Sequence, residues 1–150
     1  AYEKNLKNIL RFKKLGGTCV GSLNKLITKV DILTIHLNLT KENRNILNKN
    51  YFNKIRKNII LINCARAELI NDNALISALK SKKISYAAID VINPEPNYDK
   101  KKNHFNHKLL KAKNIFYTPH LAASTIDAQK KISKELALEL VKFLKKLKKI

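Results

Sequence analysis

Three short polar segments of the sequence each follow an apolar run, and each carries a side chain that can do chemistry. The segments are NCAR, which ends at Arg66; DVINPEP, which contains Glu95; and TPHLAAST, which contains His120. The apolar runs predict buried parallel strands, and open α/β sheets bind their ligands at the carboxyl ends of such strands. The sequence therefore predicts that a guanidinium, a carboxylate and an imidazole meet at one edge of a sheet, a set suited to moving a proton and a hydride.

Each of these side chains has a chemical use and an ordinary structural alternative. Arg66 can hold a substrate carboxylate through two parallel hydrogen bonds, which lysine cannot copy, or it can form a surface salt bridge with Glu68. His120 can take or return a hydroxyl proton near neutral pH, or it can be satisfied by backbone in a turn. Glu95 can fix the tautomer of a histidine, or it can be an exposed loop residue between two prolines.

Five further residues complete the set of candidates. His36 ends a predicted strand and is placed beside a cofactor, whereas His104 and His107 fall in a lysine-rich loop and are expected to be solvated. Asp90 can accept a hydrogen bond from a nicotinamide carboxamide or cap the following turn. Glu3 follows a possible strand, the position from which an acidic residue binds the adenosine ribose in dinucleotide folds.

The elements that must position these residues alternate between strand and helix. Strands are predicted at 31–37, 59–63, 84–91 and 115–117, with the tail of another at 1–3. Helices are predicted at 5–15, 22–30, 71–79 and from 124 onward, with one or two short helices within 40–55, a loop at 93–106 and one helical turn at 107–111. This alternation predicts an α/β fold with a parallel sheet covered on both faces.

The composition limits the classes of function. The 150 residues suffice for one domain with a core, and 45% of them are hydrophobic. The net charge of +20 is spread over almost every segment, so neither a nucleic-acid partner nor a membrane partner is expected. A basic nucleic-acid binder stays open as an alternative, and it predicts lysines clustered on one face. The two cysteines indicate no disulfide framework, so a cytoplasmic location is expected, and no metal site is expected.

Longer motifs, in the same order, resemble one family. NCARAELIN (63–71), AAIDVINPEP (87–96), TPHLAAST (118–125) and, upstream, DILTIHLNLT (31–40) resemble the D-isomer-specific 2-hydroxyacid dehydrogenases over essentially the whole chain. The resemblance implies a doubly wound, Rossmann-like NAD-binding domain. It also implies that Arg66 binds the substrate carboxylate, and that Glu95 pairs with His120, the acid/base.

The same resemblance implies NAD as the cofactor. The matching cofactor-binding residues are Glu3, His36, Leu37, Asn38, Cys64, Ala65, Arg66, Asp90, Ala122 and Ala123. Four positions depart from the family pattern: Ala67, Tyr86 and Ala122 replace a usual glycine, and Asn38 replaces a usual proline. An added methyl group at 67 or 122 would crowd the cofactor or disturb a conformation that only glycine adopts freely.

The implied activity is NAD-dependent oxidation of a D-2-hydroxy acid. HLAAST is most similar to the members that oxidise 3-phosphoglycerate to 3-phosphohydroxypyruvate in serine synthesis, which implies a small phosphorylated substrate. Members that reduce glyoxylate or hydroxypyruvate, and a non-catalytic member that senses NAD and binds protein, stay open as alternatives. A homo-oligomer, a dimer or larger, is expected for the full-length protein.

The start of the chain leads to a further expectation. Its glycines, Gly16, Gly17 and Gly21, fit no dinucleotide fingerprint, and the sequence contains no Met. The family's Gly-rich phosphate loop, its first strand and its substrate domain are therefore expected to lie outside 1–150. That first strand is central in the doubly wound order, so we expect these 150 residues alone to be inactive and poorly stable.

Overall fold

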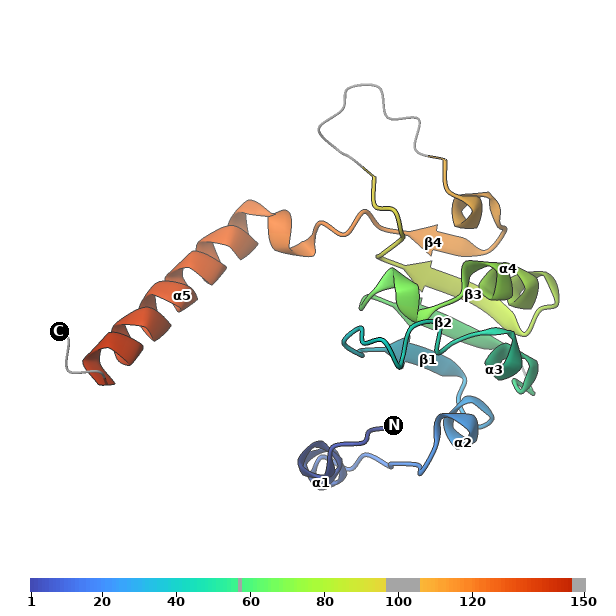
Figure 1. The fold of residues 1–150 in the computed structure, drawn as a ribbon, viewed down its shortest axis with the longest axis horizontal. Helices are drawn as coiled ribbons and strands as arrows, with labels where there is room; N and C mark the ends of the chain where they lie inside the picture. The colour runs from blue at the N-terminus through green and yellow to red at the C-terminus, as the bar shows by residue number, and fades with distance from the viewer. Residues whose placement is uncertain (57, 97–105, 147–150) are drawn as a thin grey trace. The chain divides into compact units, whose positions relative to one another are not determined.

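Four parallel strands form the centre of the fold in the computed structural model, which describes residues 1–56, 58–96 and 106–146. The chain divides into two compact units, Ala1–Thr118 and Pro119–Ile150. The sheet lies in the first unit, in the order β1-β2-β3-β4 (Figure 1). Its strands are β1 (Ile32–Ile35), β2 (Ile59–Asn63), β3 (Ile84–Ile89) and β4 (Ile115–Tyr117). The predicted strands and the α/β class are confirmed.

The register of the sheet separates two faces. Leu33, Leu61 and Ala87 are paired neighbours across β1, β2 and β3, and all three side chains are buried. The next row on that face joins Ile35 to Asn63 and Ile89, which are also buried. Because successive side chains alternate between faces, every second residue of each strand belongs to the opposite side.

The opposite side of the sheet carries exposed apolar side chains within the first unit. Ile32, Ile60 and Tyr86 form one row across it, and Phe116 lies in the next row beside Ala88. Tyr86 is 60% exposed and Phe116 68% exposed. The expectation that helices cover this second face as well stays a prediction.

Four helices of the first unit begin at polar caps. They are α1 (Leu6–Lys14), α2 (Leu23–Ile27), α3 (Lys49–Asn53) and α4 (Asp72–Lys80). Asn5, Ser22, Asn48 and Asn71 precede them, and each side chain accepts a hydrogen bond from a backbone N–H of the first turn. The predicted helices are thus confirmed, with a single short helix between 40 and 55.

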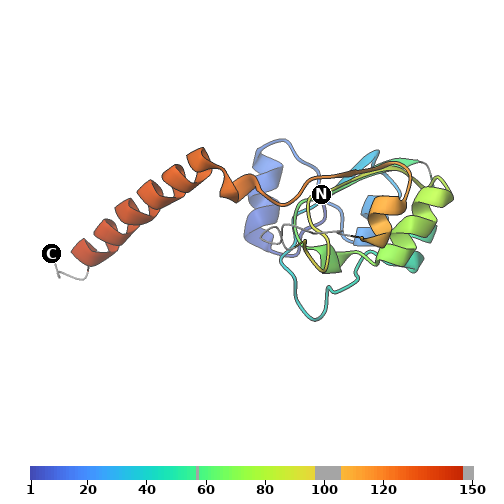
Figure 2. The ribbon, with the colours of Figure 1, turned by 90° about the horizontal axis from the view of Figure 1, so that it is seen from above.

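One core lies under the buried face of the sheet. Ile27 of α2, Phe52 of α3 and Leu75 of α4 belong to it, together with Leu109 of the 3₁₀ helix η2 (Lys108–Lys111). Figure 2 shows α4 and η2 on the same side of the sheet. The predicted helical turn at 107–111 is therefore confirmed, and it contributes to the core. The predicted loop is described only at 93–96 and 106, so His104 lies outside the described residues.

The first residues pair with a neighbouring segment without forming a regular strand. The Ala1 carbonyl accepts from the Val20 N–H at 2.8 Å, and the terminal amine donates to the Thr18 carbonyl at 2.5 Å. β1 pairs only with β2 among the described strands. The absence of a central strand and of a substrate domain stays a prediction.

The second unit consists of a short 3₁₀ helix, η3 (Ala122–Ser124), followed by the long helix α5 (Ile126–Lys146). Thr125 separates them, and its hydroxyl accepts from the Ala128 N–H at 3.3 Å, so α5 begins slightly later than the predicted residue 124. No residue of α5 is buried. Within the described residues, no helix combines the length and apolar character that crossing a membrane requires.

Candidate active site

A buried asparagine shapes the segment that carries Arg66. Asn63 ends β2 and is 1% exposed. Its Oδ1 accepts from the Ala65 N–H at 3.1 Å, and its Nδ2 donates to the Arg66 carbonyl at 3.0 Å. Both polar ends of the amide are therefore satisfied within one turn, which fixes the backbone at Arg66. The roles assigned from sequence omit Asn63, although an asparagine closing a run of four apolar residues is a visible signal.

Arg66 does not make the salt bridge offered as its ordinary alternative. Its guanidinium is exposed and donates through Nη1 to the Ala65 carbonyl at 2.7 Å. Glu68 instead accepts from the Asn93 amide at 3.3 Å, and no ion pair joins Arg66 to Glu68 in the described part of the chain. The guanidinium thus keeps most of its donors on the solvent side.

The carboxyl ends of β2, β3 and β4 are tied together around Asp90. The Asp90 N–H donates to the Asn63 carbonyl at 3.0 Å. The Asp90 carboxylate accepts a short hydrogen bond from the Thr118 hydroxyl, and the Thr118 N–H donates to the Ile89 carbonyl at 3.0 Å. The Asp90 side chain therefore links the carboxyl ends of β3 and β4, and its role beside the nicotinamide stays a prediction.

Glu95 lies on an exposed segment that begins from a buried anchor. Val91 and Ile92 are buried directly after β3, whereas Asn93, Pro94 and Glu95 are exposed. The Asn93–Pro94 peptide bond is cis. Asn93 is held at both its polar ends, because its side-chain amide reaches Glu68 and its carbonyl oxygen lies 3.3 Å from His107 Nε2.

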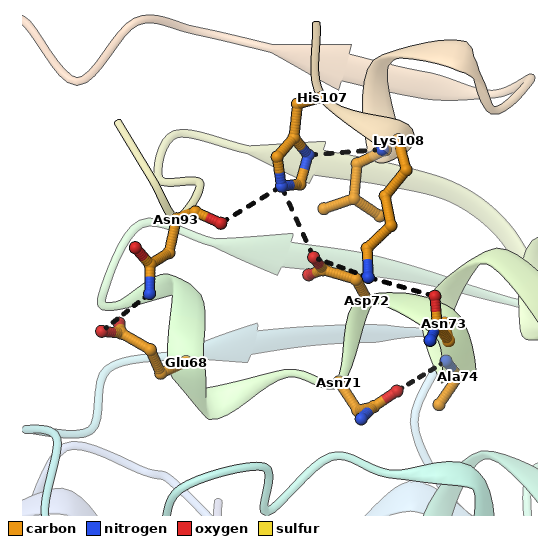
Figure 3. Close-up of polar contacts among 9 residues, drawn as sticks. Glu68, Asn71, Asp72, Asn73, Ala74, Asn93, His107 and Lys108 are labelled. Carbon is orange, nitrogen blue, oxygen red and sulfur yellow. Dashed lines mark hydrogen bonds and ion pairs between the residues drawn. The ribbon is translucent and has the colours of Figure 1, made fainter. Parts of the chain in front are cut away.

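The prediction that His107 is solvated is wrong. His107 is 7% exposed and lies between the Asn93 segment and α4 (Figure 3). The prediction rested on the many lysines of this stretch, which indicate exposure to solvent. In the structure, however, His107 and Leu109 are buried and Lys108 between them is exposed, so residue composition does not report burial here.

His120 belongs to the second unit, and its backbone has a left-handed φ of 53°. Such a conformation is uncommon for a residue other than glycine, and it clusters at functional sites. The pairing of His120 with Glu95 stays a prediction. Ala67 and Ala122, which replace family glycines, are absent from the described residues with positive φ, so neither is held in a conformation that needs glycine.

A cavity of about 700 Å³ brings together three of the predicted cofactor residues. Glu3, His36 and Leu37 line it, beside Ile32 of β1 and Phe12 of α1. The Asn38 carbonyl instead accepts from the Asn43 amide at 2.6 Å. Cys64, Ala65 and Asp90 follow β2 and β3 and are not among the residues that line this cavity, and Ala122 and Ala123 lie in the second unit.

Glu3 is present as a carboxylate at the wall of this cavity. Hydrogen bonds from the Asn5 N–H, the Asn8 side chain and the Lys4 N–H lower its pKa below the ordinary value of 4.5. Nearby, the His36 ring nitrogen Nε2 lies 2.9 Å from the Thr34 hydroxyl. Among the described residues, no group of three or more potential ligands is arranged to hold a metal ion.

A parallel sheet with polar segments at the carboxyl ends of successive strands is the arrangement in which doubly wound α/β domains bind their ligands, dinucleotides among them. Residues 1–122 match the family described as D-isomer specific 2-hydroxyacid dehydrogenase, NAD binding domain. The chain belongs to this family, and the resemblance read from its motifs is confirmed.

Comparisons with individual proteins support the family assignment. D-3-phosphoglycerate dehydrogenase of Bacillus subtilis is 38% identical over 137 residues, which are 91% of this chain and 25% of that protein. Glyoxylate reductase of Thermofilum pendens is 37% identical over 82% of this chain and 34% of that protein. The structure of D-lactate dehydrogenase with NAD⁺ from Lactobacillus jensenii superposes with a TM-score of 0.69 and 28% identity, over 83% of this chain and 38% of that one. The chain thus spans about a quarter to a third of the length of these curated relatives.

NAD is the cofactor of this family, and the residues of the cavity fit its adenosine end. Apolar side chains such as Leu37 and Ile32 suit the faces of a purine. The ionised carboxylate of Glu3 is a pure hydrogen-bond acceptor, which suits the two hydroxyl groups of a ribose.

Proposed function

We propose that the chain is the NAD-binding part of an enzyme that interconverts a D-2-hydroxy acid and the corresponding 2-keto acid. In this proposal Arg66 binds the substrate carboxylate, His120 is the acid/base, and Glu95 holds the imidazole. The residues that hold the cofactor are those named from the family motifs: Glu3, His36, Leu37, Asn38, Cys64, Ala65, Arg66, Asp90, Ala122 and Ala123.

One observation carries the proposal. Glu68, two residues after Arg66, accepts a hydrogen bond from Asn93, two residues before Glu95. The backbone bond from Asp90 to Asn63 links the same two strand ends. The segments that carry Arg66 and Glu95 are therefore neighbours across β2 and β3, and β4, the next strand, leads into the segment of His120.

The chemistry needs three tasks from the chain. As the alcohol is oxidised, the imidazole of His120 takes the hydroxyl proton while C2 loses a hydride. The carboxylate of Glu95 stabilises the imidazolium that forms, and the guanidinium of Arg66 orients the substrate through its carboxylate. NAD, when bound, supplies the acceptor for the hydride. In the reverse direction His120 returns the proton to the carbonyl oxygen.

For the substrate we propose 3-phosphoglycerate. The support is the likeness to D-3-phosphoglycerate dehydrogenase of Bacillus subtilis and the HLAAST motif that follows Pro119. Glyoxylate or hydroxypyruvate is the second candidate, because glyoxylate reductase of Thermofilum pendens is nearly as similar. A comparison of kcat/KM for 3-phosphohydroxypyruvate, hydroxypyruvate and glyoxylate with the full-length gene product decides between them.

The experiment that tests the catalytic roles uses His120→Asn in the full-length gene product. We expect kcat for 2-keto acid reduction to fall by about 10²–10⁴-fold, the usual contribution of a general acid. Affinity for NADH, measured by fluorescence titration, should change little, because the substituted side chain acts on the substrate. Undiminished turnover by His120→Asn would remove His120 from the mechanism.

Arg66→Lys and Glu68→Gln form a matched pair in the same assay. Arg66→Lys keeps the charge but loses the two-pronged hydrogen bond, so KM for the keto acid should rise. Glu68→Gln retains an acceptor for Asn93 and should leave KM nearly unchanged. A wild-type protein that binds NADH but turns over none of the three keto acids would favour the non-catalytic, NAD-sensing alternative.

A further inference from the structure

Both ring nitrogens of the buried His107 are engaged, and they contact different segments. Nδ1 accepts a hydrogen bond from the Leu109 backbone N–H at 3.3 Å, so the His107 side chain caps the start of η2. Nε2 lies 3.3 Å from the Asn93 carbonyl oxygen and 3.5 Å from Asp72 Oδ2 (Figure 3). His107 therefore connects η2, the segment after β3 and the first turn of α4.

These contacts determine which nitrogen carries the proton. The Leu109 N–H is a donor, so Nδ1 must offer its lone pair. The proton of the neutral ring then lies on Nε2, which donates toward the Asn93 carbonyl and the Asp72 carboxylate. Because Leu109 donates to one ring nitrogen while Asn93 and Asp72 offer acceptors to the other, the orientation of the imidazole ring is fixed.

Lys108 contacts the same carboxylate oxygen of Asp72 as His107 does. Its Nζ lies 3.5 Å from Asp72 Oδ2 and 3.1 Å from Asn73 Oδ1. The Asp72 carboxylate is thereby held at the start of α4, where it also suits the helix dipole. The acceptor that His107 faces thus belongs to a well-packed helix.

The segment that His107 reaches leads from the buried residues Val91 and Ile92 to Glu95. Pro94 and Pro96 have no backbone N–H, and Asn93, Pro94 and Glu95 are exposed. Asn93 makes two contacts beyond its own segment: its amide donates to the half-buried Glu68, and its carbonyl lies beside the buried His107. Glu95 follows Asn93 by two residues on a stiff proline-flanked backbone, so a displacement of Asn93 is transmitted to Glu95.

We propose that His107 is a positioning residue, which sets the place of the Glu95 carboxylate through its hydrogen bond to the Asn93 carbonyl. The proposal rests on the role proposed above for Glu95. His107 touches neither substrate nor cofactor in this scheme. It acts by preventing a displacement of the Asn93–Glu95 segment, and small displacements of reacting groups have large effects on rate.

Two substitutions separate this role from the role of His107 as a cap. In His107→Asn the amide oxygen replaces Nδ1 and keeps the acceptor for Leu109, but nothing reaches Asn93. In His107→Gln the longer side chain places an amide N–H near the position of Nε2, so the bond to Asn93 can form. Lys108→Ala is the control, because it removes the contact to Asp72 and leaves Asn93 alone.

The first measurement is made by NMR on the full-length gene product. We expect His107→Asn to shift the backbone resonances of Asn93 and Glu95, His107→Gln to return them toward wild type, and Lys108→Ala to leave them unchanged. The second is turnover by the full-length gene product. There His107→Asn should lower kcat by about tenfold to a hundredfold with KM and NADH affinity nearly constant, and His107→Gln should recover most of the loss.

The outcomes distinguish the positioning role of His107 from the catalytic function proposed above. Unshifted resonances in His107→Asn would overturn the positioning role whatever the enzyme does. Equal loss of kcat in both His107 variants, in step with their loss of stability, would also overturn it. If the NMR result is as expected but the wild-type protein turns over no keto acid, then the positioning of Glu95 holds and the proposed catalytic function fails.

Discussion

Two helices of the first unit, α1 and α4, have the same length and the same kind of cap, yet only one contributes to the core. Each has nine residues and an N-cap asparagine whose side chain accepts from the first turn. α4 buries Ala74, Leu75, Ala78 and Leu79, whereas α1 buries nothing. The difference teaches that capping and amphipathic spacing define a helix locally, while packing supplies its stability.

The largest expected effect is on the free energy of unfolding, when Leu75 of α4 and Leu10 of α1 are each truncated to alanine. Leu75 is fully buried and Leu10 is 52% exposed. We expect Leu75→Ala to lower the free energy of unfolding by about 2–5 kcal/mol, because it leaves a cavity in the core. Leu10→Ala should change it by less than about 0.5 kcal/mol. Urea unfolding followed by circular dichroism measures both, and comparable losses for the two variants would contradict the comparison.

The two caps sharpen the comparison at a smaller scale. Asn71 Oδ1 accepts from the Ala74 N–H at 2.9 Å, and Asn5 Oδ1 accepts from the Lys7 N–H at 2.9 Å. Asn71→Ala should cost about 1 kcal/mol of global stability, the usual value for losing such a cap. Asn5→Ala should instead speed hydrogen exchange within α1 alone, since α1 can fray without opening the core. A global loss from Asn5→Ala would show that α1 is coupled to the sheet.

The smallest expected effect is a dependence of the order of α1 on pH, through the Glu3 carboxylate at its start. The Glu3 carboxylate accepts from Lys4, Asn5 and Asn8, and its pKa is lowered for that reason. A lowered pKa means that the stabilisation is present above the ordinary value of 4.5 and is lost as the pH falls through the lower value in the folded chain. We expect the amides of α1 to lose order below that range, as seen by NMR between pH 7 and pH 3. Glu3→Gln should abolish this dependence, while the buried strand β2, which carries no ionisable side chain, serves as the internal control.

The sequence was sufficient for the elements whose residues satisfy local rules. The run Ile59–Ile62 predicts a strand, and helices are predicted at 5–15 and 71–79, without reference to the rest of the fold. The family motifs likewise predict which residues follow each strand. Glu3 and His36 both line one cavity, and their roles at the cofactor stay predictions.

Burial was harder to predict, because it depends on contacts between distant segments. His107 lies among lysines in the sequence, and only the approach of α4 and the Asn93 segment buries it. Asn63 received no role of its own, because its value lies in two hydrogen bonds across a turn.

The exposed side of the sheet in the first unit has a practical consequence. Tyr86 and Phe116 are large apolar side chains on adjacent rows of that side, and both are more than half exposed. Exposed apolar side chains that lie close together favour aggregation of a protein as its concentration rises. The strong positive charge of +20 opposes this by mutual repulsion, so added salt, which screens that repulsion, should promote precipitation.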